Sequence, residues 1–287
     1  MVVARLRAAG CVFAEDEAAV LVSATDSPAE LDAMVARRAA GEPLEQVVGW
    51  AEFAGLRVLV DPGVFVPRRR SEFLVEVAVR LAGPRDGGVP RLVADVCCGT
   101  GALGLAVAVE LTSAAEAAER DAVRPASPVL RLRGVELHAA DLDPAAVACA
   151  RRNVEPAGGQ VHQGDLLGAL PLGLRGRISV LICNAPYVPT SEIAFMPAEA
   201  RDHEALIALD GGPDGLAILR RVAADAGTWL TTGGVLLVET SERQAPAMAA
   251  AMTAAGLAAQ VHEDDDSGAT VVTGVSARTM PHDANRT

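Results

Sequence analysis

The stretch Asp95-Val96-Cys97-Cys98-Gly99-Thr100-Gly101-Ala102-Leu103-Gly104 decides the fold of this chain. It follows the apolar run 93–96, which reads as a buried strand, and it opens a helical pattern at 102–110. Glycine lets the backbone turn sharply and approach a ligand closely, where a side chain would collide. A strand, a glycine loop and a helix in this order predict a ligand-binding loop.

Strand and helix patterns alternate on the C-terminal side of this loop. Further strands are expected at 135–140, around Val161, at 180–183 and at 235–239, and further helices at 144–153, 215–224 and 245–255. Asp143 followed by Pro144 marks one helix start, since Asp caps free N–H groups and Pro suits the first helical position. This alternation predicts a doubly wound α/β domain, a mostly parallel sheet with helices on both faces.

The remaining sequence adds smaller regions around this domain. Residues 1–44 have helical periodicity and predict a short helical N-terminal region, while 45–70 alternate like strands and predict a β-hairpin linker bordering the site. The α/β domain is expected to span 71–276. Within it, 112–133 is rich in Ala, Glu, Pro and Arg and reads as an insertion, and 277–287 is a polar tail.

Composition narrows the function classes. With 287 residues, 51% of them hydrophobic, the chain can bury a large core. Its net charge of −12 argues against a protein that grips nucleic-acid phosphates. No apolar run approaches the ~20 residues that a membrane span requires. The five cysteines form no CxxC pair, as in a reducing compartment. We therefore expect a cytoplasmic protein without a nucleic-acid partner, membrane partner or metal; the oligomeric state stays open.

The glycine loop alone also fits the GxGxxG pattern of nicotinamide and flavin proteins. Two features count against that interpretation. Asp95 ends the strand four residues before the first glycine, where methyltransferases of this fold place an acid near the methionine end of their cofactor. The next strand-end acid, Asp141, lies 37 residues beyond Gly104, against about 20 in the dinucleotide pattern. The insertion at 112–133 could absorb this excess, so spacing alone leaves the dinucleotide open.

Two further acids follow strand ends. Asp141 is placed to accept hydrogen bonds from both hydroxyls of a ribose; as an alternative it could cap a helix, although Asp143 fills that role better. Asp165 follows the third expected strand and could receive an adenine amino group, or be an ordinary surface turn residue. Together the two acids predict a site for the nucleoside part of a cofactor.

The turn Asn184-Ala185-Pro186-Tyr187 ends the strand at 180–183 and is typical of methyltransferases acting on nitrogen. A primary amide offers two N–H donors in one plane, and the Asn184 side-chain oxygen and the Ala185 carbonyl can accept both. Pro186 stiffens the loop and Tyr187 offers a flat wall for the substrate. The alternative is a proline turn in which Asn184 bonds only its own backbone.

At this point the chain resembles the HemK/PrmC-type protein-glutamine N-methyltransferases, which modify a glutamine amide of peptide release factors or of a ribosomal protein. The resemblance runs from about Gly41 to Val275. Besides the glycine loop and the turn, the matching residues include Glu42-Pro43-Leu44, Gly49, Glu52-Phe53, Gly55-Leu56, Asp61 to Val64, Pro67-Arg68, Glu72, Glu204, Ala208 to Gly212 and Asp214 to Leu216. Their order along the chain makes the resemblance more specific than either motif.

The resemblance implies a Rossmann-like fold and an enzyme that transfers a methyl group from S-adenosyl-L-methionine to nitrogen. The implied cofactor contacts are Asp95, Cys97, Gly99, Thr100, Gly101, Asp141, Leu142, Asp165, Leu166 and Asn184. The implied substrate contacts are Phe65, Arg68, Arg70, Asn184, Pro186, Tyr187 and Glu204, with Asn184, Ala185, Pro186 and Tyr187 as the catalytic turn. The implied partner is a glutamine-bearing protein such as a release factor.

Four departures from the family pattern keep a second hypothesis open. The turn has Ala185 where the family usually has Pro, Arg69-Arg70 replace a Pro and an acid, Ala205 replaces a Pro, and only 41 residues precede Glu42. These changes favour a small-molecule N-methyltransferase acting on a free amino acid, amide or guanidino group, such as that of arginine, in a biosynthetic pathway. Arginines near the pocket would suit the carboxylate of a free amino acid. The net charge of −12 disfavours a nucleic-acid methyltransferase. A protein that only senses the cofactor would have no use for the turn Asn184 to Tyr187.

Overall fold

A seven-stranded sheet forms the centre of the computed structural model, which describes residues 1–83, 89–118 and 131–277. The strands are β3 (Arg91–Val96), β4 (Val135–Asp141), β5 (Gln160–Gln163), β6 (Ile178–Cys183), β7 (Leu230–Thr240), β8 (Leu257–Asp264) and β9 (Ala269–Ser276). Their order is β5-β4-β3-β6-β7-β9-β8, and β3 to β7 are parallel. The predicted α/β class is confirmed.

The last two strands were not predicted. β9 pairs antiparallel with both β7 and β8, and β8 and β9 form a hairpin at the sheet edge. Two consecutive strands without a helix between them can pair antiparallel through a tight turn, whereas parallel neighbours need a crossover. The alternation earlier in the chain gave no indication of this change.

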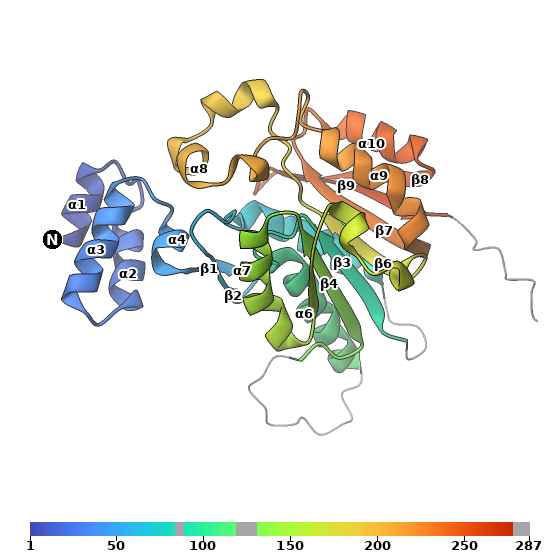
Figure 1. Ribbon diagram of the computed structural model, residues 1–287, viewed down its shortest axis with the longest axis horizontal. Coiled ribbons are helices and arrows are strands. Elements are labelled where there is room, and N and C mark those ends of the chain that lie inside the picture. Colours follow the sequence, from blue (N-terminus) through green and yellow to red (C-terminus); the bar gives the residue numbers. More distant parts are fainter. Residues whose placement is uncertain (84–88, 119–130, 278–287) are drawn as a thin grey trace, which may run out of the picture.

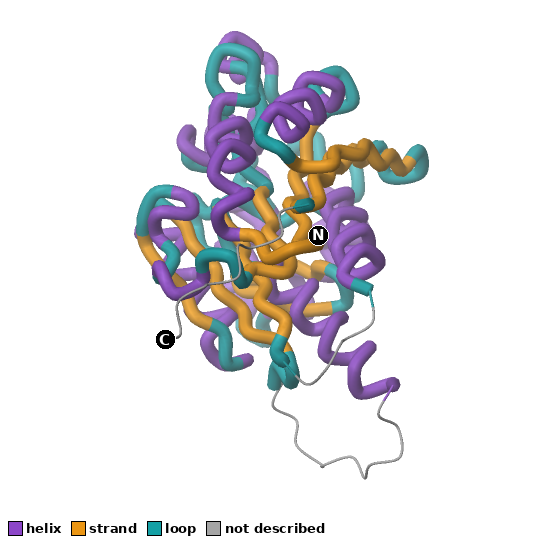
Figure 2. Tube along the Cα trace, turned by 90° about the vertical axis from the view of Figure 1, so that its right-hand side faces the viewer, coloured by secondary structure: helices purple, strands orange, loops and turns teal. Residues whose placement is uncertain are grey.

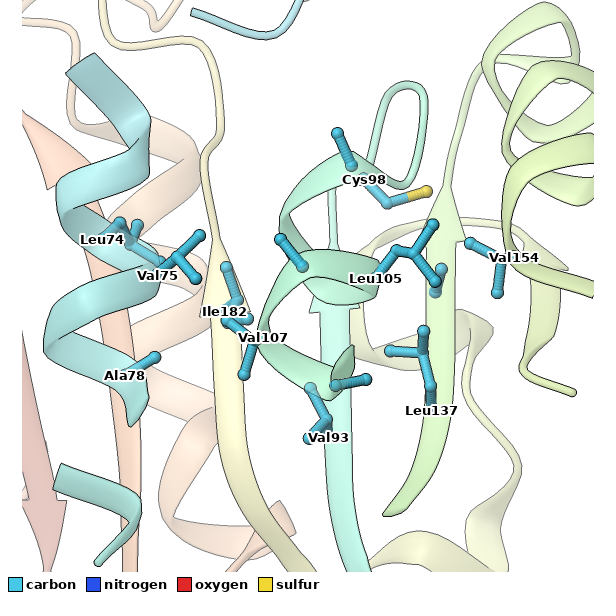
Figure 3. Packing of buried hydrophobic residues seen from close by; sticks show 14 of the residues in the cluster. Leu74, Val75, Ala78, Val93, Cys98, Leu105, Val107, Leu137, Val154 and Ile182 are labelled. Carbon is cyan, nitrogen blue, oxygen red and sulfur yellow. The ribbon is translucent and has the colours of Figure 1, made fainter. Parts of the chain in front are cut away.

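Helices cover both faces of the sheet (Figures 1 and 2). One face carries α5 (Glu72–Ala82), α6 (Ala102–Ala118) and α7 (Pro144–Val154), and the other carries α9 (Ala217–Trp229) and α10 (Ala245–Ala254). Figure 3 shows the first face, where Val75 of α5 and Val107 of α6 lie beside Ile182 of β6, and Leu105 of α6 points toward Leu137 of β4. Alternate residues of one strand therefore face opposite helical layers, as a doubly wound fold requires.

The expected insertion at 112–133 overlaps the end of helix α6. Residues 112–118 continue helix α6, so the helix is longer than the pattern at 102–110 indicated. Residues 119–130, most of the expected insertion, lie outside the described residues, as do residues 278–287 of the expected polar tail. Short 3₁₀ turns occur at Arg69–Ser71, Glu155–Ala157, Leu166–Ala169, Leu172–Leu174, Thr190–Phe195 and Leu206–Ala208.

A small helical region precedes the sheet and has its own core. It comprises α1 (Val2–Ala8), α2 (Ala14–Ala24), α3 (Pro28–Ala39) and α4 (Leu44–Val48), followed by the hairpin strands β1 (Trp50–Phe53) and β2 (Leu56–Leu59). Leu6, Leu21 and Val35 are buried among these helices. The helices reach Val48, four residues past the expected boundary, because the left-handed Gly49 (φ 82°) ends α4 there.

An ion pair between Arg38 of α3 and Glu199 of α8 (Ala198–His203), at 3.4 Å, connects the helical region to the α/β domain. Arg38 also contacts Glu17 of α2, within the helical region, at 2.7 Å. In Figure 1, α8 lies above the hairpin and between the helical region and the sheet. No helix among the described residues is long and apolar enough to cross a membrane.

Candidate active site

A cavity of about 240 Å³ lies at the edge of the sheet where the parallel strands β3, β4 and β6 end. The loops that follow these strands form one side of it, and residues 63–71 and 204–209 form the other. Its walls carry fifteen of the residues expected from the sequence: Phe65, Arg68, Arg70, Cys97, Gly99, Thr100, Asp141, Leu142, Asp165, Leu166, Asn184, Ala185, Pro186, Tyr187 and Glu204. Asp95 and Gly101 are not among its lining residues.

The glycine loop shows why Gly101 lies away from the cavity. A Cβ at Gly101 would come within 2.7 Å of the Val154 side chain, and one at Gly104 within 2.7 Å of the Asp95 Cβ. These two glycines therefore permit close packing of α6. At Gly99 (φ 55°) a Cβ would meet no other protein atom within 4 Å, and Gly99 lines the cavity. Of these three positions, Gly99 is the one whose backbone lines the cavity.

Asp95 lies beneath the loop and is completely buried. Its Oδ2 accepts a hydrogen bond from the Gly104 N–H at 2.8 Å, while Oδ1 has no hydrogen-bond partner among the described residues. Burial raises the pKa of Asp95 to about 7, against the lowering effect of the Gly104 N–H. The carboxyl therefore joins the end of β3 to the first turn of α6, and it lies beneath the glycine loop without lining the cavity.

Asp141 shapes the loop as well as the cavity wall. Its Oδ2 accepts from the Gly99 N–H at 2.8 Å and its Oδ1 from the Asp143 N–H at 3.0 Å. Burial raises its pKa, and these N–H groups oppose the rise. Each carboxylate oxygen has a second lone pair, so Asp141 can still accept from two ribose hydroxyls. Asp143 accepts from the Ala145 N–H at 2.9 Å and is the predicted helix cap.

Asp165 and Leu142 stand at the outer part of the wall. The Asp165 carboxylate forms an ion pair with Arg221 at 2.6 Å, with both side chains more than half exposed, so the pair contributes little to stability. One Asp165 oxygen remains available to an amino group. Leu142 is half exposed, and Ile218 lines the same cavity. Apolar walls with one carboxylate fit a flat, amino-bearing ring such as adenine.

The Asn184 side chain has a defined orientation. Its Nδ2 donates to the Ser71 Oγ and to the Glu239 Oε2, each at 3.4 Å. A carboxylate can only accept, so the amino end of Asn184 must face Glu239. The Oδ1 atom accepts no hydrogen bond from the described part of the chain. The amide oxygen is therefore the end available to a substrate.

Tyr187 is fixed by its hydroxyl group. It donates to the Glu239 Oε1 at 2.9 Å and accepts from Arg70, whose Nε also contacts Glu239 Oε1 at 3.1 Å. Burial, followed by the Glu239 charge, raises the pKa of Tyr187. The backbone of the turn is held separately, because Gln244 Nε2 donates to the Tyr187 carbonyl at 2.9 Å. The sequence patterns did not identify Glu239 and Gln244 as residues of the site. The available indication for Glu239 was that a charged residue directly follows the apolar run 235–238.

Glu204 and Arg68 meet at the wall opposite the glycine loop. Glu204 Oε1 accepts from Arg68 and from the Val66 N–H at 3.4 Å, and Oε2 has no partner among the described residues. Burial raises the pKa of Glu204, with Arg68 acting in the opposite direction. Arg68 and Arg70 thus each have a carboxylate of their own, and Arg69 does not line the cavity. This weakens the expectation that these arginines bind a substrate carboxylate.

The fold and the site together define the class of protein. A parallel sheet, a glycine loop, a strand-end acid and an Asn-Ala-Pro-Tyr turn meet around one cavity. Together they mark the chain as an S-adenosylmethionine-dependent N-methyltransferase. A methyltransferase from Pyrococcus furiosus of known structure has the same fold, with a TM-score of 0.50, 13% identity, and coverage of 78% of this chain and 90% of that one. No protein-family model matches the sequence.

Comparison with curated proteins gives the family. The release factor glutamine methyltransferase of Streptomyces coelicolor is 37% identical over 211 residues, which cover 74% of this chain and 67% of that protein. A 4-amino-L-phenylalanine/4-methylamino-L-phenylalanine methyltransferase of Streptomyces pristinaespiralis is 34% identical over 224 residues, covering 77% and 69%. The matched part thus spans about two thirds of these relatives. This chain belongs to the family of the release factor glutamine methyltransferases.

Proposed function

We propose that this enzyme methylates the side-chain amide nitrogen of a glutamine within a protein, and that a peptide chain release factor is its substrate. The observation that carries the proposal is the orientation of Asn184, whose amino end is bound by Ser71 and Glu239. Its free Oδ1 and the Ala185 carbonyl offer two acceptors to one primary amide. The release factor as substrate comes from the names of curated relatives that are 36–37% identical to this chain.

The charges of the substrate half of the cavity support an uncharged acceptor. Arg68 pairs with Glu204 and Arg70 with Glu239, so two positive and two negative side chains cancel there. A free amino acid would bring a further carboxylate to two arginines that each already have one. A glutamine inside a protein carries no such group, because its backbone is in peptide bonds. The pairing therefore favours a protein-bound glutamine.

The transfer is a single in-line displacement. The cavity wall around Gly99, Asp141 and Asp165 would hold S-adenosyl-L-methionine, which would supply an electrophilic methyl group on its sulfonium and leave as a thioether once that methyl is bonded to nitrogen. Asn184 and Ala185 bind both N–H groups of the amide, which turns one face of the nitrogen toward the methyl group. Their oxygen dipoles also stabilise the positive charge that grows on nitrogen, before one proton passes to water. An amide nitrogen is a weak nucleophile. Most of the rate enhancement therefore comes from positioning this nitrogen and from excluding water from the site.

A second candidate is N-methylation of a free amino acid. The relative from Streptomyces pristinaespiralis, which is 34% identical to this chain, favours it because its name describes action on 4-amino-L-phenylalanine.

A protein substrate, by contrast, needs a docking surface on the enzyme, commonly ~800 Å² per partner in a stable complex. The helical region of residues 1–48 supplies the obvious candidate for that surface.

One incubation series separates the two functions. The enzyme and methyl-labelled cofactor are mixed with purified release factor and, separately, with free glutamine, arginine and 4-amino-L-phenylalanine, and mass spectrometry locates the label. The proposal predicts label on a glutamine side chain of the release factor. Label on a free amino acid and none on the protein would overturn it and establish the second candidate.

A further inference from the structure

Glu239 connects three parts of the substrate site without lining the cavity. It ends β7, is 2% exposed, and accepts from Asn184 Nδ2 through Oε2 and from Tyr187 and Arg70 through Oε1. Its partners come from residues 70, 184 and 187, which are distant in sequence from β7. Among the described residues, the printed side-chain hydrogen bonds of Glu239 all lead to groups of the site, and burying a carboxylate is costly unless such partners satisfy it.

The carboxylate discriminates between the two orientations of the Asn184 amide. Rotation of that amide by 180° would place Oδ1 against Glu239 Oε2, where two acceptors face each other without a hydrogen atom. Ser71 cannot make this choice, because a hydroxyl both donates and accepts. The carboxylate of Glu239 therefore favours the orientation in which Asn184 Nδ2 faces Glu239 and Oδ1 faces away from it.

We propose that Glu239 is a positioning residue for methyl transfer, which acts by fixing the Asn184 amide with its oxygen toward the accepting nitrogen. The proposal rests on the proposed function to the extent that Asn184 binds the acceptor. The turn's backbone does not depend on Glu239, because Gln244 holds the Tyr187 and Asp214 carbonyls at 2.9 and 2.8 Å. Loss of the Glu239 charge should thus release a side-chain orientation and preserve the turn.

A double-mutant cycle between Glu239 and Asn184 tests the proposal in rate. Glu239→Gln, which can donate to Asn184 Oδ1, should lower kcat at least tenfold and change the cofactor Kd and the acceptor KM by less than about threefold. In an Asn184→Ala background the same substitution should change kcat less than twofold, because the group through which it acts is gone. Glu242→Gln, at an exposed position three residues further on, is the matched control and should leave kcat unchanged. Additive effects, or loss of cofactor binding in Glu239→Gln, would overturn the proposal.

A second measurement does not depend on the acceptor. In ¹⁵N-labelled protein the side-chain NH₂ resonances of Asn184 are assigned by their loss in Asn184→Ala. They should shift in Glu239→Gln and in Glu239→Asp, which shortens the side chain, and stay in place in Glu242→Gln. Unshifted resonances in a folded Glu239 variant contradict the proposal. If the wild-type enzyme leaves the release factor unlabelled, the proposed substrate fails, while these resonances still decide the role of Glu239.

Discussion

The Asp141 carboxylate accepts a hydrogen bond from the Gly99 backbone N–H at 2.8 Å, across 42 residues of sequence. This bond joins the end of β4 to the glycine loop that follows β3. Asp141 thus has two roles, since it holds Gly99, the glycine of this loop that lines the cavity, and itself forms part of the cavity wall. Cofactor affinity should depend on both.

Asp141→Ala should therefore weaken S-adenosylmethionine binding by about 10- to 100-fold. Loss of a charge-assisted hydrogen bond costs about 1.5–3 kcal/mol, which corresponds to this range. Calorimetric titration of the folded variant checks it, with the exposed Asp265→Ala as the control. Unchanged affinity would remove Asp141 from the cofactor site, and tight binding of a nicotinamide dinucleotide to the wild type would contradict the assignment altogether.

Asp95 should make the cofactor-free protein less stable as the pH rises. Its pKa is about 7 in the folded state against 3.8 for an exposed group, so the folded state binds the proton more tightly. Its contribution to stability is then complete below pH 4 and is lost as the pH rises to about 7. Asp95→Asn removes this dependence, so the thermal midpoint of the variant relative to wild type should be higher at pH 8 than at pH 5. A pH-independent difference would show that Asp95 titrates normally.

Glu204 should affect the acceptor and leave the cofactor unaffected. Glu204→Gln removes the charge that holds Arg68 and alters the buried Oε2 on the substrate wall. We expect the KM of the acceptor to rise about tenfold, as for one lost charged hydrogen bond, with cofactor Kd within a factor of two. Steady-state kinetics give both values, and Asp202→Asn, an exposed position two residues away, serves as control. Equal losses for acceptor and cofactor would place Glu204 outside the substrate site.

Gly104 should tolerate no side chain. A Cβ there would lie 2.7 Å from the Asp95 Cβ and 3.1 Å from Leu137 Cδ1, both in the packed interior. Gly104→Ala should lower the free energy of unfolding by about 1–3 kcal/mol, the usual cost of overpacking. Gly173→Ala is the control, because a Cβ at that position meets no atom within 4 Å. Urea denaturation compares the two, and equal stability would mean that α6 can move away from β3 without cost.

Sequence patterns predicted the parallel part of the sheet because its strands are continuous apolar runs between recognisable helix starts, such as Asp143-Pro144. They could not predict the β8–β9 hairpin, whose pairing with β7 depends on the edge that the earlier strands leave open. The cavity residues that follow strands, such as Asp141, Asp165 and Asn184, were also predictable, since parallel strands end at one edge of the sheet. Phe65, Arg68, Arg70 and Glu204 on the opposite wall were expected from the family resemblance alone.

The sequence patterns could not predict contacts between segments that are distant along the chain. From the sequence, Arg70 was expected to bind a substrate carboxylate. In the structure it pairs with Glu239, and this pairing depends on where residues 69–71 lie relative to the end of β7. Glu239 itself read as the end of an ordinary strand. Local periodicity records which face is buried, whereas these partners are set by the tertiary arrangement of three segments.

The measurement that tests the account most directly is the single-turnover rate of Asn184→Ala with bound cofactor, on the acceptor that the wild type methylates. If Asn184 positions the nitrogen, the rate should fall at least about a hundredfold, on the order of 3 kcal/mol, while cofactor affinity stays within a factor of two. Methyl transfer at the wild-type rate would show that the turn is structural and that the nitrogen is held elsewhere.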